Sequence, residues 1–373
     1  MRVRALTARS FRNLGETSAS FAAGVNLIVG GNGEGKTSLL EAISVLANLR
    51  SFRTVRWSAV ACHGHAGFAV LGEIEGRQGG FRLEQSVELG PPLRRRLLVN
   101  GAPVPVERYL SLCPVVSLTG ADGELVLGAP GVRRALLDRF AFLLAPSTLE
   151  VLRRFQRTLR QRNAGLAGAA SDRELDAWDD QLAVAAAELL ARRRRAVTAL
   201  AHAFQGAYDA LQGAGFPPVA LSYRVESWLN GSEITAEVEE SYRKRYNETR
   251  VRDRHAGHTQ DGPHRHDLGI VAGDHPAREV LSSGQIKVVA AALRLATVLH
   301  VERERGEPLP VMVDDVDAEL DREVFARLTR VLASERQLLL TSAHPELVAP
   351  AFPEALVLTM QGGDCRPRAG TGE

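Results

Sequence analysis

The chain has 373 residues, of which 45% are hydrophobic and 24% charged, and its formal net charge is +2. These values are typical of a globular protein, and the length favours two domains over one. No apolar run approaches the roughly 20 residues of a membrane-spanning helix, and the first ten residues contain no apolar signal segment, so a cytoplasmic protein is expected. The three cysteines are far apart and predict neither a disulfide framework nor a zinc site.

The first 48 residues predict a strand, a hairpin, a second strand, a loop and a helix. The apolar run Val25–Val29 enters a cluster of glycines, and Ser38–Ile43 leaves that cluster with helical spacing. Gly30–Thr37 reads G-G-N-G-E-G-K-T, which fits the phosphate-loop pattern G-x-x-x-x-G-K-[ST] in its required strand–loop–helix context. The alternative interpretation is a Gly-rich turn that matches by chance.

This loop predicts a nucleotide site, because glycines let the backbone curve around a phosphate and the helix N-terminus attracts the anion. Lys36 would reach the outer phosphates, and the hydroxyl of Thr37 would coordinate Mg²⁺. Only Lys36, Lys244 and Lys287 are lysines among 46 basic residues, so a lysine retained in the loop favours a role that arginine cannot fill. The candidate nucleotide-binding residues of the loop are Gly30, Gly31, Asn32, Gly33, Glu34, Gly35, Lys36, Thr37 and Ser38.

The middle of the chain predicts a change from strands to helices. Between about residues 67 and 104, short alternating segments broken by Gly-Gly and Pro-Pro indicate antiparallel strands. From about residue 130 to 213 the pattern is helical, with a break before the capping box of Ser171 and Glu174, so two long helices are expected. Residues 214–256 are mixed and carry no assignment.

Strand and helix signals alternate in the last third of the chain. Strands are expected at Leu268–Val271, Val311–Val313 and Leu338–Thr341, and helices at Gln285–Glu302 and Asp321–Ala333. This alternation predicts an α/β fold with a parallel sheet covered on both faces.

The expected architecture is therefore a nucleotide-binding head that an insertion divides. The head takes residues 1–117 and 257–360 and includes the antiparallel β subdomain. The insertion, residues 118–256, is a mostly helical lid or arm. Residues 361–373 are expected to form a disordered tail.

Pro310–Asp315 predicts an apolar strand followed by two carboxylates. A parallel sheet would present both carboxylates at its carboxyl edge, beside the phosphate loop. Asp314 would hold Mg²⁺ through water, and Asp315 would orient the attacking water or accept its proton. Taken alone, such a strand end is equally consistent with a helix N-cap or a surface turn.

Leu281–Gln285 reads L-S-S-G-Q and opens a predicted helix, which provides a second helix N-terminus able to attract an anion. These residues resemble the L-S-G-G-Q signature of the ABC ATPases, with Ser283 in place of the first glycine. In that superfamily the loop covers the γ-phosphate bound to a partner subunit, so the resemblance implies a head-to-tail homodimer held together by ATP. It adds Ser282, Gly284 and Gln285 to the nucleotide-binding residues. An ordinary Ser N-cap is the alternative interpretation.

The same resemblance implies two statements about catalysis. His344, which follows a predicted strand, resembles the switch histidine of the superfamily, although a lone His at a strand end is often only a surface side chain. Most ATPases of this kind carry Glu where this chain has Asp315, and the shorter side chain would act through another water, so slow hydrolysis is expected. The candidate catalytic residues are then Asp315, Lys36 and His344, with Thr37 and Asp314 as the residues that hold Mg²⁺.

Several local sequences resemble the RecF family within this superfamily. They are F-R-N at Phe11–Asn13, L-L-E-A-I at Leu39–Ile43, R-S-F-R-T at Arg50–Thr54, Pro130 with R-R-A-L-L-D at Arg133–Asp138, G-P-H-R-H-D at Gly262–Asp267, and the pair Asp314–Asp315. The resemblance spans residues 1 to about 345. It departs from the family at Gly120–Ala121, where Pro-Glu is expected, and at His266, where Asp is expected.

The resemblance implies a weak, DNA-dependent ATPase of recombinational repair and replication restart. Such a protein dimerises with ATP, binds gapped or junctional duplex DNA, and works with RecR and RecO to load RecA on single-stranded gaps. The residues themselves add only arginine clusters able to contact phosphates, at Arg94–Arg96, Arg153–Arg162 and Arg192–Arg195. The alternatives are an ABC transporter ATPase subunit, which the long insertion disfavours, and an ATP-binding DNA clamp without useful hydrolysis.

Overall fold

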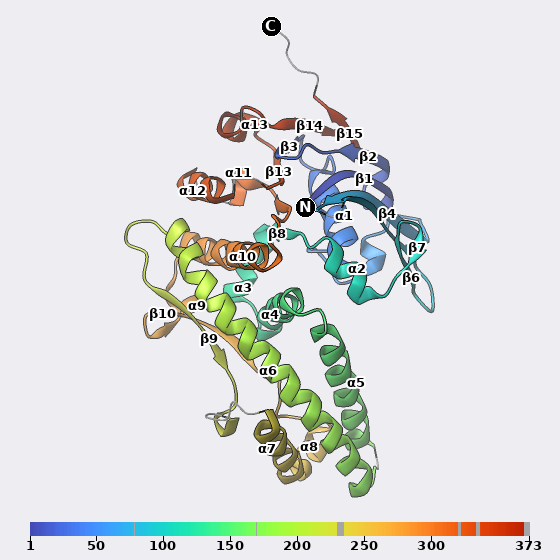
Figure 1. The fold of residues 1–373 in the computed structure, drawn as a ribbon, viewed down its shortest axis with the longest axis vertical. Coiled ribbons are helices and arrows are strands. Elements are labelled where there is room, and N and C mark those ends of the chain that lie inside the picture. Colours follow the sequence, from blue (N-terminus) through green and yellow to red (C-terminus); the bar gives the residue numbers. More distant parts are fainter. Residues whose placement is uncertain (78, 169, 230–234, 320–321, 333–335, 369–373) are drawn as a thin grey trace. The chain divides into compact units, whose positions relative to one another are not determined.

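The computed structural model describes residues 1–77, 79–168, 170–229, 235–319, 322–332 and 336–368 (Figure 1). Contacts divide the chain into two compact units. Unit 1 comprises Met1–Gly123, Gly206–Phe216 and Ser282–Glu373, and unit 2 comprises Glu124–Gln205 and Pro217–Leu281. Unit 1 is therefore discontinuous along the chain.

Unit 1 contains a six-stranded sheet whose centre is parallel. Its order is β15 (Asp364–Pro367), β14 (Leu356–Gln361), β3 (Val25–Val29), β13 (Leu338–Ser342), β12 (Val311–Val313) and β8 (Val116–Leu118). Only the edge strand β15 runs antiparallel to its neighbour. The carboxyl ends of β3, β13 and β12 consequently lie at one edge, which is where a parallel α/β sheet places its ligand.

A second six-stranded sheet of unit 1 is entirely antiparallel. Its order is β2 (Leu14–Ser20), β1 (Arg2–Phe11), β4 (Gly67–Gly76), β5 (Gly79–Glu88), β6 (Arg94–Val99) and β7 (Ala102–Pro103). The predicted antiparallel strands between residues 67 and 104 are confirmed. The helix α1 (Lys36–Asn48) contacts strands of both sheets, and these contacts bury it along nearly its whole length.

The remaining helices of unit 1 follow the alternation that the sequence predicts. They are α2 (Val106–Leu112), α10 (Ser283–Arg305), α11 (Val316–Glu319), α12 (Arg322–Leu332) and α13 (Pro345–Val348), with short 3₁₀ turns η1 (Trp57–Ala59), η2 (Gly120–Gly123) and η4 (Ala349–Ala351). The predicted helix ends Asp321 and Ala333 lie outside the described residues.

The helix α10 is long and apolar enough to cross a membrane, which differs from the expectation that no run approaches that length. Of its apolar window, 67% is buried inside the structure, however. Buried residues on all sides of the helix account for its composition, as in the core helix of a globular protein.

Unit 2 is built from helices and one small sheet. Its helices are α3 (Glu124–Leu127), α4 (Pro130–Leu144), α5 (Thr148–Ala167), α7 (Thr235–Glu248), α8 (Arg250–Ala256), α9 (Ala277–Val280), the turn η3 (Ser227–Leu229) and most of α6 (Asp172–Leu211). A core of apolar residues from α5, α6 and α7 includes Phe155, Leu189 and Tyr242. The predicted break before α6 is confirmed, since Ser171 N donates to Glu174 Oε2 at 2.8 Å and Glu174 N donates to Ser171 Oγ at 3.4 Å.

Three expectations about these elements were wrong. The strand predicted at Leu268–Val271 is β10 (Asp267–Ala272), but it pairs antiparallel with β9 (Val219–Arg224) and β11 (His275–Pro276) in unit 2. Residues 257–281 therefore lie with the insertion, because their strand pairs with β9 and not with the parallel sheet. Within the expected tail, Asp364–Pro367 forms β15, whose hydrogen bonds to β14 hold it.

Two of the arginines proposed for DNA contact are buried in ion pairs of unit 2. Arg162 is fully buried and donates to Asp179 Oδ1 at 2.6 Å and to Asp253 Oδ2 at 2.8 Å. Arg193 donates to Asp138 Oδ1 at 2.6 Å. Because their guanidinium groups are enclosed, neither side chain is available to a phosphate, and these two assignments were wrong.

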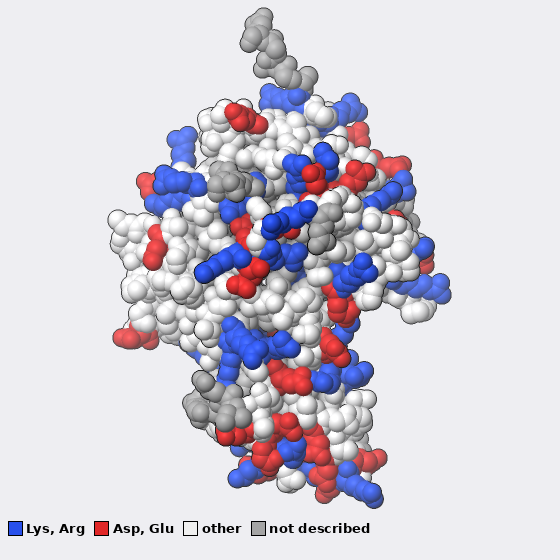
Figure 2. Space-filling model, in the orientation of Figure 1, with Lys and Arg blue, Asp and Glu red and all other residues white. Residues whose placement is uncertain are grey.

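Exposed charges of unit 2 are also extensively paired. Figure 2 shows acidic and basic side chains interleaved over the end of the unit where α7 and α8 lie. In α7, Arg243 donates to Asp180 Oδ1 at 2.7 Å, and in α8 the mostly buried Arg250 donates to Asp176 Oδ1 at 2.5 Å. This end carries both signs of charge, so it does not form a uniformly positive surface.

His266, where the family resemblance predicts Asp, belongs to a buried hydrogen-bond network of unit 2. His266 Nε2 lies 2.5 Å from Glu226 Oε2, and its Nδ1 lies 3.0 Å from the hydroxyl of Tyr223. Burial lowers the pKa of His266, and the Glu226 carboxylate partly opposes that shift. The histidine is thus held by hydrogen bonds inside unit 2, immediately before β10.

Candidate functional site

The predicted phosphate loop connects β3 to α1 in unit 1, and glycine is required at two of its positions. Gly30 has φ 156°, and a Cβ there would lie 2.5 Å from the carbonyl oxygen of Met360. Gly35 has φ 108°, and a Cβ there would lie 3.0 Å from a methyl group of Leu14. Both positions combine a backbone conformation that favours glycine with a close neighbour, so the glycines of this loop follow from its geometry.

Lys36 begins α1, and its side chain turns back over the loop. Its ammonium donates to the carbonyl oxygens of Gly30 at 2.8 Å and Gly31 at 3.0 Å. The residue is only 5% exposed. A positive charge and a helix N-terminus are therefore held together at the open side of the loop.

Glu34 and Ser38 fix the two sides of the loop. Glu34 Oε2 accepts a bond from Gly362 N, and its carbonyl oxygen accepts one from Gly363 N at 3.1 Å. The hydroxyl of Ser38 donates to Asn13 Oδ1 at 2.7 Å. These contacts tie the loop to the turn between β14 and β15 and to the hairpin between β1 and β2.

The two predicted carboxylates follow β12 and face the start of α1. Thr37 Oγ1 donates to Asp314 Oδ1 at 3.0 Å, although the two residues are far apart in sequence. Asp314 is 9% exposed, and burial raises its pKa against the opposing effect of its hydrogen bonds from Thr341 and Thr37. A hydroxyl and a carboxylate, both hard oxygen donors, thus meet in a half-enclosed place suited to a small divalent cation.

Asp315 is one of the few residues other than glycine with positive φ, at 45°. Asp315 lines a cavity of about 310 Å³ together with the phosphate loop. The lining residues are Asn13, Asn32, Gly33, Gly35, Lys36, Thr37, Ser38, Arg53 and Asp315. This volume lies at the lower end of the range for small-molecule sites, and its walls are mostly polar.

Asn13 and Arg53 also line this cavity, and neither was predicted to do so. Asn13 Nδ2 donates to the carbonyl oxygen of Gly33 at 2.8 Å. Arg53 lies 3.5 Å from the carboxylate of Glu41, which is completely buried and also accepts bonds from Arg12 and Ser51. The motifs F-R-N and R-S-F-R-T contain these residues, so the available signal was the resemblance and not the chemistry.

The predicted signature residues lie at the N-terminus of α10. Ser282 caps the helix: its hydroxyl accepts from Gln285 N at 3.3 Å, and Gln285 Oε1 accepts from Ser282 N at 2.9 Å. Ser282 and Gly284 are exposed. Among the described residues that line the 310 Å³ cavity, none belongs to this helix start, so within one chain the two predicted anion sites remain separate.

His344 is likewise outside the described lining of that cavity. Its backbone N donates to Ser342 Oγ at 2.9 Å, and its imidazole Nδ1 lies 3.3 Å from Glu346 Oε1. The side chain is 64% exposed. The site in one chain therefore brings together Lys36, Thr37, Asp314 and Asp315, but not His344.

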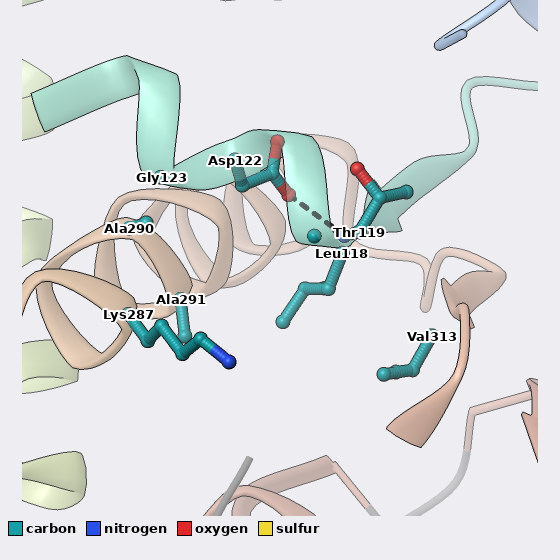
Figure 3. Close-up of a pocket in the computed structure, with 9 residues that line it drawn as sticks. Leu118, Thr119, Asp122, Gly123, Lys287, Ala290, Ala291 and Val313 are labelled. Atoms are coloured by element: carbon teal, nitrogen blue, oxygen red, sulfur yellow. Dashed lines mark hydrogen bonds between the residues drawn. The ribbon is translucent and has the colours of Figure 1, made fainter. Parts of the chain in front are cut away.

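A second, much smaller cavity of about 30 Å³ lies beside α10, between the ends of β8 and β12 (Figure 3). Lys287, Ala290 and Ala291 line it from α10, and Asp122 accepts a bond from Thr119 N at 3.0 Å on the opposite wall. A space of this size holds about two water molecules. It is too small for a nucleotide. The candidate site is the 310 Å³ cavity because the phosphate loop lines it.

Similarity to known proteins covers nearly the whole chain. Residues 2–365 match the family model described as the RecF/RecN/SMC N terminal domain. The chain is 32% identical to the DNA replication and repair protein RecF of Cyanothece sp. over 97% of each chain. It is 37% identical to the RecF protein of Acidothermus cellulolyticus, over 90% of this chain and 92% of that protein.

Solved structures show the same fold. The structure of the recombination mediator protein RecF-ATP in the RecFOR pathway superposes with a TM-score of 0.88 and 23% identity, covering 98% of this chain and 97% of that one. An SMC head bound to the C-winged helix domain of ScpA superposes with a lower TM-score of 0.55. The predicted class, a P-loop ABC-type ATPase head with an antiparallel β subdomain and a mostly helical insertion, is confirmed. Since relatives above 30% identity extend over almost all of its length, the chain belongs to the RecF family.

Proposed function

We propose that this chain is an ATP-dependent DNA-binding protein of recombinational repair and replication restart, and that it hydrolyses ATP slowly. The observation that carries the proposal is the 310 Å³ cavity, in which the phosphate loop, Lys36, Thr37 and Asp315 converge. Relatives named DNA replication and repair proteins support the biological setting. The ATP in the related RecF-ATP structure supports the choice of nucleotide.

The phosphate loop would bind the triphosphate through its backbone N–H groups and the N-terminus of α1. Lys36 would then exchange its bonds to the Gly30 and Gly31 carbonyls for bonds to phosphate oxygens, which keeps its charge satisfied in both states. Thr37 and Asp314 would hold Mg²⁺, since their oxygens already meet at 3.0 Å. When bound, the cation would neutralise part of the phosphate charge.

Asp315 would orient the attacking water or accept its proton, because it is the carboxylate that lines the cavity. Asp314 is less suited to that role, since its Oδ1 already accepts bonds from two hydroxyls. Asp is shorter than Glu by one methylene, so Asp315 would act on the attacking water through a second, bridging water. Slow turnover follows.

The signature residues would complete the site of a second subunit. Ser282 and Gly284 are exposed at the start of α10, a helix long enough for its N-terminus to attract an anion. This helix start does not line the cavity of its own chain, so it would not contact a nucleotide bound there. Its exposed end would instead bind the γ-phosphate of a nucleotide held by a partner. ATP would therefore hold a head-to-tail homodimer together, with His344 approaching the phosphate in the same assembly.

The proposed dimer predicts that Ser282→Arg prevents ATP-driven dimerisation. Wild-type chain should sediment as a dimer with Mg-ATP and as a monomer without nucleotide, whereas the variant should remain monomeric with ATP. An arginine side chain at the exposed helix start would block the approach of the partner's phosphate loop. Binding of a fluorescent ATP analogue to the variant should persist, because the phosphate loop is unchanged.

Ser147→Arg is the matched control, since Ser147 is an exposed residue at the start of α5 in unit 2. It should dimerise like the wild type. A Ser282→Arg chain that still dimerises at the same ATP concentration would contradict the proposed arrangement. Wild-type chain without affinity for ATP in the presence of Mg²⁺ would remove the proposed function altogether.

DNA is the proposed macromolecular partner, in gapped or junctional duplex form. The exposed arginines Arg94–Arg96, Arg157, Arg160 and Arg195 would contact phosphates, and such contacts carry no sequence information. RecR, together with RecO, would act with the DNA-bound dimer to load RecA. The RecFOR pathway of the related RecF-ATP structure supports these partners.

Binding through phosphates predicts a steep dependence on salt. The logarithm of the affinity for gapped duplex should fall linearly with the logarithm of salt concentration, by a slope of about 0.9 for each phosphate neutralised. Fluorescence anisotropy with labelled DNA in Mg-ATP measures this slope, and sedimentation over the same salt range checks that the dimer persists. An affinity that does not change with salt would contradict a surface that binds the DNA backbone.

A further inference from the structure

Thr341 occupies a central place between the two halves of the candidate site. It is the penultimate residue of β13, which lies between β3, the strand before the phosphate loop, and β12, the strand before the two carboxylates. It is opposite Ile28 of β3, and Leu340 before it is opposite Val313 of β12. Its side chain is completely buried.

The hydroxyl of Thr341 makes two short hydrogen bonds, one with the side chain of Asp314 and one with the backbone of Asp315. It donates to Asp314 Oδ1 at 2.7 Å. It also accepts from the backbone N of Asp315 at 2.7 Å. Since a hydroxyl has a single proton, the proton of Thr341 lies toward Asp314 and a lone pair lies toward Asp315. One oxygen atom thus links the side chain of the first aspartate to the backbone of the second.

The bond to Asp315 occurs where the backbone needs support. Asp315 has φ 45°, a left-handed conformation that costs a residue with a Cβ free energy and persists where its surroundings impose it. The bond from its N–H to Thr341 is one such constraint. The resulting turn leads from β12 to the position where Asp315 lines the cavity.

The bond to Asp314 restricts the rotation of that carboxylate, which belongs to the proposed cation site. Asp314 Oδ1 accepts from Thr341 on one side and from Thr37 at 3.0 Å on the other, so two hydroxyls from different elements fix one oxygen. The rotation of the carboxylate is thereby restricted, and its position relative to the phosphate loop is set. Any buried hydroxyl needs hydrogen-bond partners, and both partners of Thr341 belong to the two aspartates of the candidate site.

We infer that Thr341 is a positioning residue for ATP hydrolysis, whose hydroxyl holds Asp314 at the cation site and turns Asp315 into the cavity. The inference rests on the proposed ATPase function. Thr341 does not touch the reacting atoms, so it acts through the two aspartates. Its removal should therefore affect turnover and cation binding more than folding.

Thr341→Val tests the hydroxyl, because valine keeps the shape and removes both bonds. The kcat for ATP should fall by on the order of 10 to 10²-fold, the loss typical of a displaced catalytic group. The affinity for Mn²⁺, measured by electron paramagnetic resonance with a non-hydrolysable ATP analogue, should also fall. Thr341→Ser, which restores the hydroxyl, should recover both quantities.

A double-variant cycle identifies the residue through which Thr341 acts. In the Asp315→Asn background, Thr341→Val should lower kcat by much less than in the wild type, because the group that it positions is already disabled. Losses in kcat that are fully additive would overturn the link to Asp315. Unchanged kcat and Mn²⁺ affinity in Thr341→Val would overturn the inference while leaving the proposed ATPase intact.

Two comparisons separate positioning from stability. Thr297→Val removes a buried hydroxyl of α10 that donates to the carbonyl oxygen of Leu293 at 3.0 Å, and its kcat should equal that of the wild type. Should Thr341→Val unfold below the assay temperature, Thr341→Ser and Thr341→Ala provide the same test, since they differ only in the hydroxyl. Equal kcat in that pair would overturn the inference. A wild-type chain that binds no ATP would instead overturn the proposed function and this inference with it.

Discussion

Asp315→Asn should slow ATP hydrolysis by on the order of 10² to 10⁴-fold while ATP binding and ATP-driven dimerisation remain. This range corresponds to about 3 to 5 kcal/mol of transition-state stabilisation. Asn has nearly the same size as Asp but cannot accept the proton of the attacking water. The measurement is single-turnover hydrolysis with excess protein, accompanied by sedimentation in Mg-ATP.

Binding should survive this change for an electrostatic reason. Asp315 lines the same cavity as Lys36 and Thr37, so its negative charge would repel the triphosphate that they attract. Removing that charge leaves the attraction of Lys36 and the phosphate loop for the nucleotide unchanged. Because hydrolysis would no longer end the bound state, the ATP-dependent dimer of the variant should also persist longer than that of the wild type.

Asp364→Asn is the matched control, since Asp364 is an exposed aspartate of β15 that pairs only weakly with Arg366, at 3.4 Å. Its turnover should equal that of the wild type. Unchanged turnover in Asp315→Asn would refute the assignment of the catalytic carboxylate and favour an ATP-binding DNA clamp without useful hydrolysis. Loss of ATP binding in that variant would instead indicate a structural role for Asp315.

Arg162→Leu should destabilise unit 2 by about 3 to 5 kcal/mol, the cost of leaving buried charges without their partner. Arg162 is fully enclosed, and Asp253, which is also completely buried, would lose its 2.8 Å bond to the guanidinium. Asp179 would keep a second bond, from Arg250 at 2.7 Å. Asp253 would keep a longer contact, with Arg252 at 3.9 Å, so it is the carboxylate left with the weaker compensation.

Denaturant unfolding followed by tryptophan fluorescence measures this effect, because Trp178 and Trp228 both lie in unit 2. Arg157→Leu, an exposed arginine of the same helix, should change the free energy of unfolding by no more than about 0.5 kcal/mol. Adding Asp253→Asn to Arg162→Leu should recover part of the loss, since it removes the buried charge. A loss below about 1 kcal/mol in Arg162→Leu would show that water reaches the ion pairs.

The candidate site depends on both local and distant parts of the chain. The phosphate loop and α1 were predictable because their signal is local: glycines at fixed spacing, a lysine and an apolar strand before them. The carboxylate pair was predictable for the same reason, as a strand that ends in Asp314 and Asp315. Their meeting, with Thr37 3.0 Å from Asp314, follows from parallel strands that end at one edge.

Other residues of the site had no chemical signal in their local sequence. Arg53 lines the cavity from a segment after α1, and Asn13 reaches the loop from a hairpin, because contacts between distant segments place them there. Arg162 and Arg160 look alike in the sequence, yet the first is buried in ion pairs and the second is exposed. Composition counts both as positive charge, while burial decides which one solvent can reach.

By itself, the sequence determined the α/β class and most strands and helices of unit 1. It also predicted the candidate site residues Lys36, Thr37, Asp314 and Asp315, since each prediction depends on neighbours within a few positions. Only the tertiary structure decided that β10 pairs with β9 and not with the parallel sheet, because an apolar strand is equally suited to either. It also decided the role of Thr341, whose hydroxyl could not be related to Asp314 and Asp315 until β12 and β13 were paired. Hydrogen bonds between strands that are distant in sequence set that register, and periodicity along one strand does not contain it.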